Sequence, residues 1–222
     1  MALKQSLLFI FIVFLSSCSS SKSINENFNN IKTLKDYSIE KPIKVFSRKD
    51  IENIEYPLIE IKTNGILRQA LMLPISQRGN FVNYTSGSGQ LITMNGAVIT
   101  KTNGFNINLI SVEINKNSPL LFLKRPENWQ EKGYRTYSYV NSINQIYSET
   151  YECKLILKEK QEVFIVGIRY KLTNIEEQCI KEDKSFVNLY WVDDNGFVWQ
   201  SNQRLKNKIF AFLTIIKPLK KP

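Results

Sequence analysis

The stretch YSETYECKLILKEKQEVFIVGIRYKLT, residues 147–173, decides the fold, because it holds the longest pair of alternating segments in the chain. Residues 147–158 and 163–173 each place apolar side chains on one face and charged side chains on the other. The apolar faces consist of Tyr147, Tyr151, Cys153, Leu155 and Leu157, and of Phe164, Val166, Ile168, Tyr170 and Leu172. The opposite faces carry Glu152, Lys154, Lys158, Arg169 and Lys171. This period of two is typical of an antiparallel sheet with one buried and one solvated face.

Similar segments lie on both sides of this pair. They cover residues 55–63, 67–73, 79–86, 90–94, 97–101, 105–114, 134–140, 186–192, 197–203 and 209–216. Asn-Gly pairs at 64–65, 95–96 and 103–104 tolerate the positive φ angles of tight hairpin turns. The pattern predicts an all-β protein, an antiparallel β-barrel or barrel-like sandwich. A membrane-spanning barrel inverts the same alternation, but a lipid anchor (below) would make it redundant.

Short helices are predicted near the N-terminus. Apolar residues recur near a 3.6-residue period over residues 24–37, which indicates an amphipathic helix. A second short helix is expected to begin at Ser47 or Asp50, both good N-cap residues, and to end before Pro57. No linker or repeat follows residue 45, so residues 31–222 are expected to form a single β domain.

The N-terminus resembles that of an exported lipoprotein. Lys4 precedes an apolar run over residues 7–15, which is too short to span a bilayer. The sequence Leu15-Ser16-Ser17-Cys18 resembles the bacterial lipobox, which predicts a signal peptide of residues 1–17 and acyl chains such as palmitate on Cys18. The alternative is ordinary secretion with an unrelated cysteine.

The residues after the lipobox cysteine bear on where the anchor sits. Ser19 does not resemble the aspartate of an inner-membrane retention signal, which favours a periplasm-facing protein of the outer membrane. Residues 18–30, rich in Ser and Asn, are predicted to be a flexible tether.

The other two cysteines, Cys153 and Cys179, are expected to form a disulfide in an oxidising compartment. If 147–158 and 163–173 form a simple hairpin, Cys153 pairs near Gly167. A loop over residues 174–184 would then have to fold back about 20 Å to reach it, which is within its length at ~3.3 Å per residue. Two separate buried thiols are the alternative.

The chain is basic, with 30 Lys and Arg against 20 Asp and Glu, a formal net charge of +10. An exported lipoprotein does not normally meet nucleic acid, so no nucleic-acid partner is expected. Attraction to anionic lipid head groups or to an acidic polysaccharide fits the compartment better. Solvated lysines without any partner are the alternative.

No catalytic, metal or cofactor site is predicted. The chain contains no histidine, which removes the Ser-His-Asp and Cys-His arrangements and the common zinc sites. A glycan hydrolase built on a carboxylate pair is the alternative. The acids available to it are Glu149, Glu152, Glu176, Glu177, Asp193 and Asp194. Acids at turns and on solvated strand faces are usually just hydrated, so no enzymatic activity is expected.

A glycan-binding loop is the best site candidate. The segment KRPENWQEKGYRTY, residues 124–137, carries aromatic residues between charges, as a platform for sugar rings would. The residues proposed for it are Trp129, Tyr134, Arg135 and Tyr137. The alternative is that these aromatic residues fill the core of a β protein.

The lipobox is followed by two further recognisable segments, NYTSGSGQLITMNGAVITKTNGFNINL at residues 83–109 and FVNLYWVDDNGFVWQSNQ at 186–203. With Lys217-Pro218 near the end, they resemble the group 4 capsule polysaccharide lipoprotein family of the YjbF/GfcB type. The resemblance implies a β-barrel-like domain at the outer membrane that takes part in producing or exporting a surface polysaccharide, without an established enzymatic activity. Only Cys18 carries over as a functional residue.

The main hypothesis is therefore an accessory lipoprotein that acts by binding the polymer or a polysaccharide export component. A structural lipoprotein that scaffolds other envelope proteins is the alternative from a different functional class.

Overall fold

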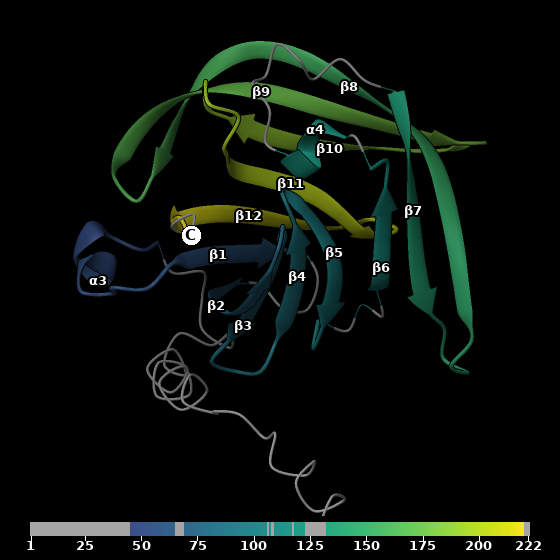
Figure 1. Ribbon diagram of the computed structural model, residues 1–222, viewed down its shortest axis with the longest axis horizontal. Coiled ribbons are helices and arrows are strands. Elements are labelled where there is room, and N and C mark those ends of the chain that lie inside the picture. The colour runs from purple at the N-terminus through teal and green to yellow at the C-terminus, as the bar shows by residue number, and fades with distance from the viewer. Residues whose placement is uncertain are drawn as a thin grey trace, which may run out of the picture.

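A computed structural model of the chain describes residues 45–64, 69–105, 107, 109–116, 118–122 and 132–219. Within these residues, twelve antiparallel strands and two short helices are found (Figure 1). The strands are β1 (Leu58–Thr63), β2 (Gln69–Arg78), β3 (Phe81–Ser86), β4 (Leu91–Asn95), β5 (Val98–Asn103), β6 (Leu109–Ile114), β7 (Lys132–Val140), β8 (Ile146–Ile165), β9 (Ile168–Lys181), β10 (Lys184–Val192), β11 (Val198–Lys206) and β12 (Ile209–Lys217). The helices are α3 (Arg48–Glu52) and α4 (Pro119–Phe122).

All twelve strands belong to one sheet, in the order β5-β4-β3-β2-β1-β12-β11-β10-β9-β8-β7-β6. Every strand pairs with its neighbours along the chain except that β5 does not pair with β6, and the first strand pairs with the last, with Ile59 opposite Ile215. The edge strands β5 and β6 lie side by side, so that the sheet curls into a nearly closed barrel (Figure 1). This confirms the predicted antiparallel all-β barrel.

The β8–β9 hairpin has a different register from the predicted one. β8 continues through the polar segment 159–162, which was expected to be a loop, and the hairpin turns at Val166-Gly167. Both turn residues have positive φ angles, 47° and 79°, as the two-residue turn of a twisted hairpin requires. Cys153 consequently lies opposite Cys179, not near Gly167. The prediction that residues 174–184 form a loop that folds back was wrong, because residues 174–181 belong to β9.

The outer half of this hairpin is a two-stranded ribbon. β7 pairs with β8 only as far as Lys154, and β10 pairs with β9 only from Thr173 onwards. The predicted buried face is confirmed within the barrel, where Tyr151, Cys153 and Leu155 are buried. In the part of the hairpin that pairs with neither β7 nor β10, the prediction of a buried face is wrong for Phe164, which is 66% exposed. The alternation of residues predicts a buried face correctly only where a third strand lies beside the pair.

Helix α3 begins after Ser47 and ends before Pro57, as predicted. The carboxylate of Asp50 accepts hydrogen bonds of 2.7 Å from both the backbone N–H and the hydroxyl of Ser47, which fixes the start of the helix. The helix buries Ile51 in a small cluster at one end of the barrel. The other members of this cluster are Phe46, Leu58, Leu71, Leu73 and Ile216, with Ile54 and Val166 packed against them.

The N-terminal segment of the chain joins the barrel at this same end, because Val45 is the first described residue. The predicted helix at residues 24–37, Cys18 and the predicted tether at 18–30 lie outside the described residues. No helix in the described part of the chain is long and apolar enough to cross a membrane.

The barrel interior is filled by side chains. One cluster of buried apolar residues runs through it and includes side chains from the first and the last strands. Gln203 on β11 reaches β5, where its Oε1 accepts a 3.1 Å hydrogen bond from the N–H of Ile99 and its Nε2 donates to the carbonyl of Ala97 at 2.8 Å. These bonds hold the edge strand β5 against the far wall of the barrel.

Replacing Gly96 by alanine is expected to destabilise the protein more than the same change at Gly79. The two glycines have nearly the same φ, +57° and +59°, and a residue with a side chain there costs about 1–2 kcal/mol. At Gly96 the added Cβ would also lie 2.5 Å from the carbonyl oxygen of Leu120 in α4, whereas at Gly79 no described atom lies within 4 Å. Chemical denaturation of both variants measures the difference, and equal losses would contradict the close packing of α4.

Candidate functional site

The residues predicted to bind glycan do not share one surface. Tyr134 is 61% exposed, but Arg135 and Tyr137 are each only 1% exposed. They alternate along β7, so that Tyr134 points outward while Arg135 and Tyr137 point into the barrel. Trp129 lies outside the described residues. A polymer on the outside of the barrel therefore cannot contact Arg135 or Tyr137, and of the described candidates only Tyr134 stays accessible.

The buried Arg135 forms an ion pair in the barrel interior. Its Nε lies 2.7 Å from Oε1 of Glu177 on β9, and its Nη2 donates a 2.8 Å hydrogen bond to the hydroxyl of Tyr190 on β10. Asn188 donates from Nδ2 to the second carboxylate oxygen of Glu177 at 2.7 Å. Side chains from β7, β9 and β10 thus provide hydrogen-bond partners for both members of a buried charge pair, which is the condition for burying it.

The ionisation of this network is fixed by its surroundings. Burial alone would lower the pKa of Arg135, but the carboxylate of Glu177 outweighs this effect and raises it. Burial raises the pKa of the Tyr137 and Tyr190 hydroxyls, so both stay neutral at physiological pH. Hydrogen bonds from Arg135 and Asn188 hold both carboxylate oxygens of Glu177 in place.

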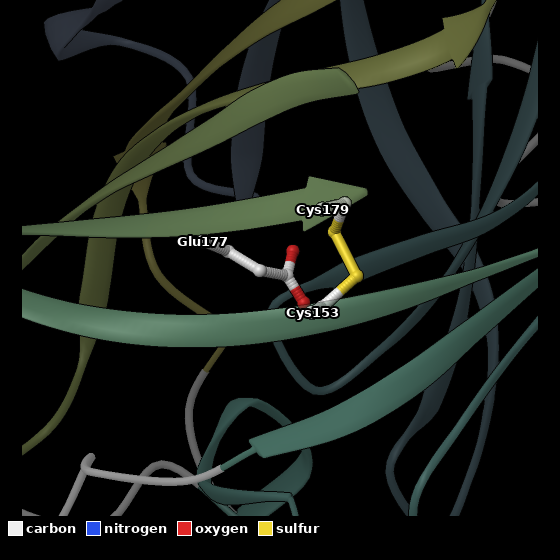
Figure 2. A group of neighbouring side chains, drawn as sticks. All are labelled: Cys153, Glu177 and Cys179. Carbon is white, nitrogen blue, oxygen red and sulfur yellow. A yellow bond between two sulfur atoms is a disulfide. The ribbon is translucent and has the colours of Figure 1, made fainter. Parts of the chain in front are cut away.

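A disulfide lies beside this ion pair and confirms the predicted Cys153–Cys179 bridge. Figure 2 shows the carboxylate of Glu177 next to the two sulfur atoms, because Glu177 precedes Cys179 by two residues on the same face of β9. One ligand atom of each of the three residues lies within 4.8 Å of the others. With both sulfurs in the disulfide, neither cysteine offers a thiolate to a metal ion.

A small pocket with room for about one water molecule opens near the disulfide. It is lined by Ile114, Asn115, Ser118, Lys132, Gly133, Tyr134, Cys153, Leu155 and Glu177. Exposed Tyr134 and Lys132 therefore border a pocket whose wall includes Glu177 of the ion pair and Cys153 of the bridge. The pocket is small for a sugar ring and nearly all its exposed lining is apolar.

A second charged group surrounds Arg204 at the end of β11. The register between β11 and β12 shifts here, with Arg204 opposite Phe210 and Lys206 opposite Ile209. Such a bulge re-aims side chains, and the guanidinium of Arg204 lies over three aromatic rings. Its Cζ is 5.2 Å from the ring centre of Tyr137, 4.7 Å from that of Tyr151 and 4.6 Å from that of Phe186.

Glu149 connects Arg204 to the surface. Its carboxylate lies 3.1 Å from Nη2 of Arg204 and 3.2 Å from Nζ of the exposed Lys184. Partial burial would raise the pKa of Glu149, but hydrogen bonds from Lys184, Tyr151 and Arg204 hold it below its usual value. Nη1 of Arg204 is buried and makes no hydrogen bond of acceptable geometry within the described residues, although the Tyr151 hydroxyl is close enough to raise the pKa of Arg204.

Two further aromatic rings extend this group outward. The ring of Tyr139 lies 5.4 Å from the ring of Tyr147, and Nζ of Lys206 lies 5.7 Å from the centre of the Tyr139 ring. Tyr139 is buried, whereas Tyr147 is 38% exposed. We call Tyr139, Tyr147, Lys184, Arg204 and Lys206 the rim cluster, because they lie where β7, β8, β10 and β11 begin or end.

The six acids considered for a hydrolase do not share one environment. Glu149 and Glu177 are held in the ion pairs described above. Glu176 lies 3.3 Å from Lys158 and Asp194 lies 2.6 Å from Lys160. Asp193 accepts hydrogen bonds from the N–H groups of Asn195 and Phe197 and from the indole of Trp199. Glu152 is exposed on the outer face of β8.

Sequence reasoning missed both ion-paired groups. It treated Arg135 as a surface residue and Glu177 as a solvated acid. The alternation of residues along β7 did indicate that Arg135 is buried, since Arg135 shares its face with Tyr137 and Tyr139. It could not identify Glu177 as the ion-pair partner of Arg135, because Glu177 lies 42 residues further along the chain.

Comparison with known proteins gives two findings. The model of the family described as "Group 4 capsule polysaccharide lipoprotein gfcB, YjbF" matches residues 31–214. The crystal structure of the hypothetical lipoprotein YmcC from Escherichia coli (K12) is similar to this chain, with a TM-score of 0.70 and 18% sequence identity over 91% of this chain and 99% of that one. At this identity the likeness extends to the fold alone. No curated protein is significantly similar to the chain.

Proposed function

This chain belongs to the group 4 capsule polysaccharide lipoprotein family, and on that premise we propose that it is an accessory protein for capsule or exopolysaccharide production or export, anchored in the outer membrane. It acts by binding, either to the polymer or to an export component. The observation that carries this proposal is the family match over residues 31–214, which follows a sequence that resembles a lipobox and ends at Cys18.

The proposed anchor explains the layout of the chain. Acyl chains on Cys18 would hold the N-terminus in the membrane, since several chains on one residue bind far more firmly than one. Residues 19–44 would connect that anchor to the barrel, which begins near Val45. Ser19 after the lipidated cysteine favours the outer membrane and a domain that faces the periplasm.

Binding without catalysis fits the chemistry of the described residues. Glycoside hydrolysis needs one carboxyl group with a raised pKa and a second, ionised one across the substrate. Glu177 instead accepts hydrogen bonds from Arg135 and Asn188, and the pKa of Glu149 is lowered. Neither is suited to donate a proton to a leaving group near neutral pH.

Deleting the gene is expected to reduce the amount of surface polysaccharide, because the export or assembly step would lack its membrane-bound accessory protein. Wild-type protein should restore the polymer, and the Cys18→Ser variant, which cannot be acylated, should not. Surface polymer is quantified in each strain, with immunoblotting of membrane fractions as the control for expression and localisation. Unchanged polymer in the deletion strain would reject the proposal and favour an envelope scaffold, which co-purifies with other proteins and has no affinity for polymer.

A further inference from the structure

We propose that the rim cluster binds the acidic sugar residues of a polysaccharide. This inference deepens the proposed function and rests on it, because it selects the polymer as the bound partner and places the site. Tyr147 would offer its exposed ring to the apolar face of a sugar, while Lys184 and Lys206 would meet the carboxylates.

The strand ends and turns around the rim cluster carry an excess of positive charge. They hold five cations against three carboxylates, a net charge of +2. The cations are Lys181, Lys184, Arg204, Lys206 and Lys208, and the acids are Glu149, Glu182 and Asp183. The Asn141–Gln145 turn between β7 and β8 carries no charge. A local excess of positive charge raises the concentration of polyanions at a surface.

The cations of the rim cluster lie around aromatic rings. The buried ring of Tyr139 lies 5.7 Å from Nζ of Lys206 and 5.4 Å from the ring of Tyr147, so that one ring contacts both the ammonium group and the exposed ring. Lys184 reaches the same region from β10 through its ion pair with Glu149. Aromatic rings beside fixed charges suit a ligand with an apolar face and an ionised edge, which describes a uronic acid.

Arg204 supports the cluster from below. Its guanidinium is held by three aromatic rings, by the carboxylate of Glu149 and by the carbonyl of Asn207, which accepts a 3.3 Å hydrogen bond from Nε. Glu149 also pairs with the exposed Lys184, so that one carboxylate is shared by two cations at this rim. The ammonium group of Lys184 therefore stays available for an incoming carboxylate.

The rim lies at the end of the barrel opposite Val45, the first described residue. The strands alternate in direction, so the turns after β7, β9 and β11 lie together at the end opposite α3 and Val45 (right and left, respectively, in Figure 1). A domain anchored through its N-terminal segment would therefore present the rim cluster away from the anchored end.

The test measures binding of the full-length, detergent-solubilised protein to polygalacturonate, a polymer of uronic acid, with neutral dextran as the reference. The wild type should bind polygalacturonate and not dextran, and its affinity should fall as salt rises. Lys184→Gln/Lys206→Gln should weaken binding about five- to tenfold, as the loss of two partly exposed charge contacts implies. Tyr147→Ala should weaken binding of polygalacturonate by a similar factor, and the affinity of this variant should still fall with salt as steeply as that of the wild type.

Two matched variants make the test specific. Lys154→Gln/Lys171→Gln removes the same charge from exposed positions on β8 and β9, and Tyr134→Ala removes an exposed ring beside the pocket. Both should bind like the wild type. Equal weakening by the two lysine pairs would show that net charge alone attracts the polymer, and would overturn the rim site. Loss of binding in Tyr134→Ala but not in Tyr147→Ala would overturn it in favour of the pocket, as would a wild type that binds no uronic acid polymer.

Complementation separates this inference from the proposed function. If the deletion strain loses its polymer and Lys184→Gln/Lys206→Gln restores it fully while Cys18→Ser does not, the anchored accessory function stands and the rim site is rejected. If deletion leaves the polymer unchanged, the proposed function itself fails.

Discussion

Replacing Glu177 by alanine is expected to lower the free energy of unfolding by about 3–5 kcal/mol, because the change leaves the guanidinium of Arg135 buried without its counter-charge. Both partners are almost fully buried, at 1% and 3% exposure, so water cannot take over the role of the carboxylate. The variant also deprives Asn188 and Tyr190 of an acceptor. Guanidinium unfolding of the purified protein, followed by tryptophan fluorescence, measures the loss.

Glu176→Ala is the matched control, one residue earlier on the same strand. Its carboxylate forms a partly exposed ion pair with Lys158, and such pairs contribute about 0–1 kcal/mol. The double variant Arg135→Met/Glu177→Leu should lose less stability than the two single substitutions added together, because neither charge is then left alone. A loss below about 1 kcal/mol for Glu177→Ala would mean that Arg135 reaches solvent in solution.

Removing the disulfide by Cys153→Ala/Cys179→Ala is expected to cost about 3–4 kcal/mol. The bridge joins residues 26 positions apart, and closing a loop of that length in the unfolded chain accounts for this amount in the chain-entropy model. The two cysteines face each other directly across β8 and β9, so the folded barrel should keep its strand pairing without the bond. The effect should therefore appear as a lower unfolding midpoint with an unchanged circular dichroism spectrum.

Chemical reduction offers an independent check on the bridge. Wild-type protein with reductant should unfold at the same denaturant concentration as the double variant without it, apart from the small packing difference between a thiol and a methyl group. Reductant should leave the double variant unaffected. A stability of the wild type that does not respond to a reductant strong enough to open the bond in the unfolded protein would contradict the assignment of 3–4 kcal/mol to loop closure.

The fold could be predicted from the sequence wherever the determining interactions are local. Alternation identified the strands, Ser47 and Asp50 identified the start of α3, and the two remaining cysteines identified the bridge. The β8–β9 register was predicted wrongly because residues 159–162 are polar on both faces, as a loop would be. These residues form strand because they lie in a two-stranded ribbon, where water reaches both faces. The hairpin turns at Val166-Gly167, where both residues have positive φ angles.

The candidate site was less predictable, because its residues meet only through the closure of the barrel. Arg204, Glu149 and Lys184 come from three different strands, and their approach depends on the β11 bulge and on the exact order of strands in the sheet. No sequence motif marks either the β11 bulge or the order of strands. The glycan-binding prediction at Arg135 and Tyr137 followed from their place in a polar, aromatic segment, but the inward face of β7 decides their position.

The pairing of β1 with β12 also has a consequence for how the chain acquires its structure. Every other strand pair joins consecutive strands and can form as soon as both have been synthesised. β1 must instead wait for the last strand, since Ile59 pairs with Ile215. Until residues up to 217 have joined the sheet, one edge of β1 remains open to pairing with other chains, as does the growing edge of the sheet. The barrel therefore closes late, and the interval between formation of the first and last strand pairs is when the folding chain is most prone to aggregate.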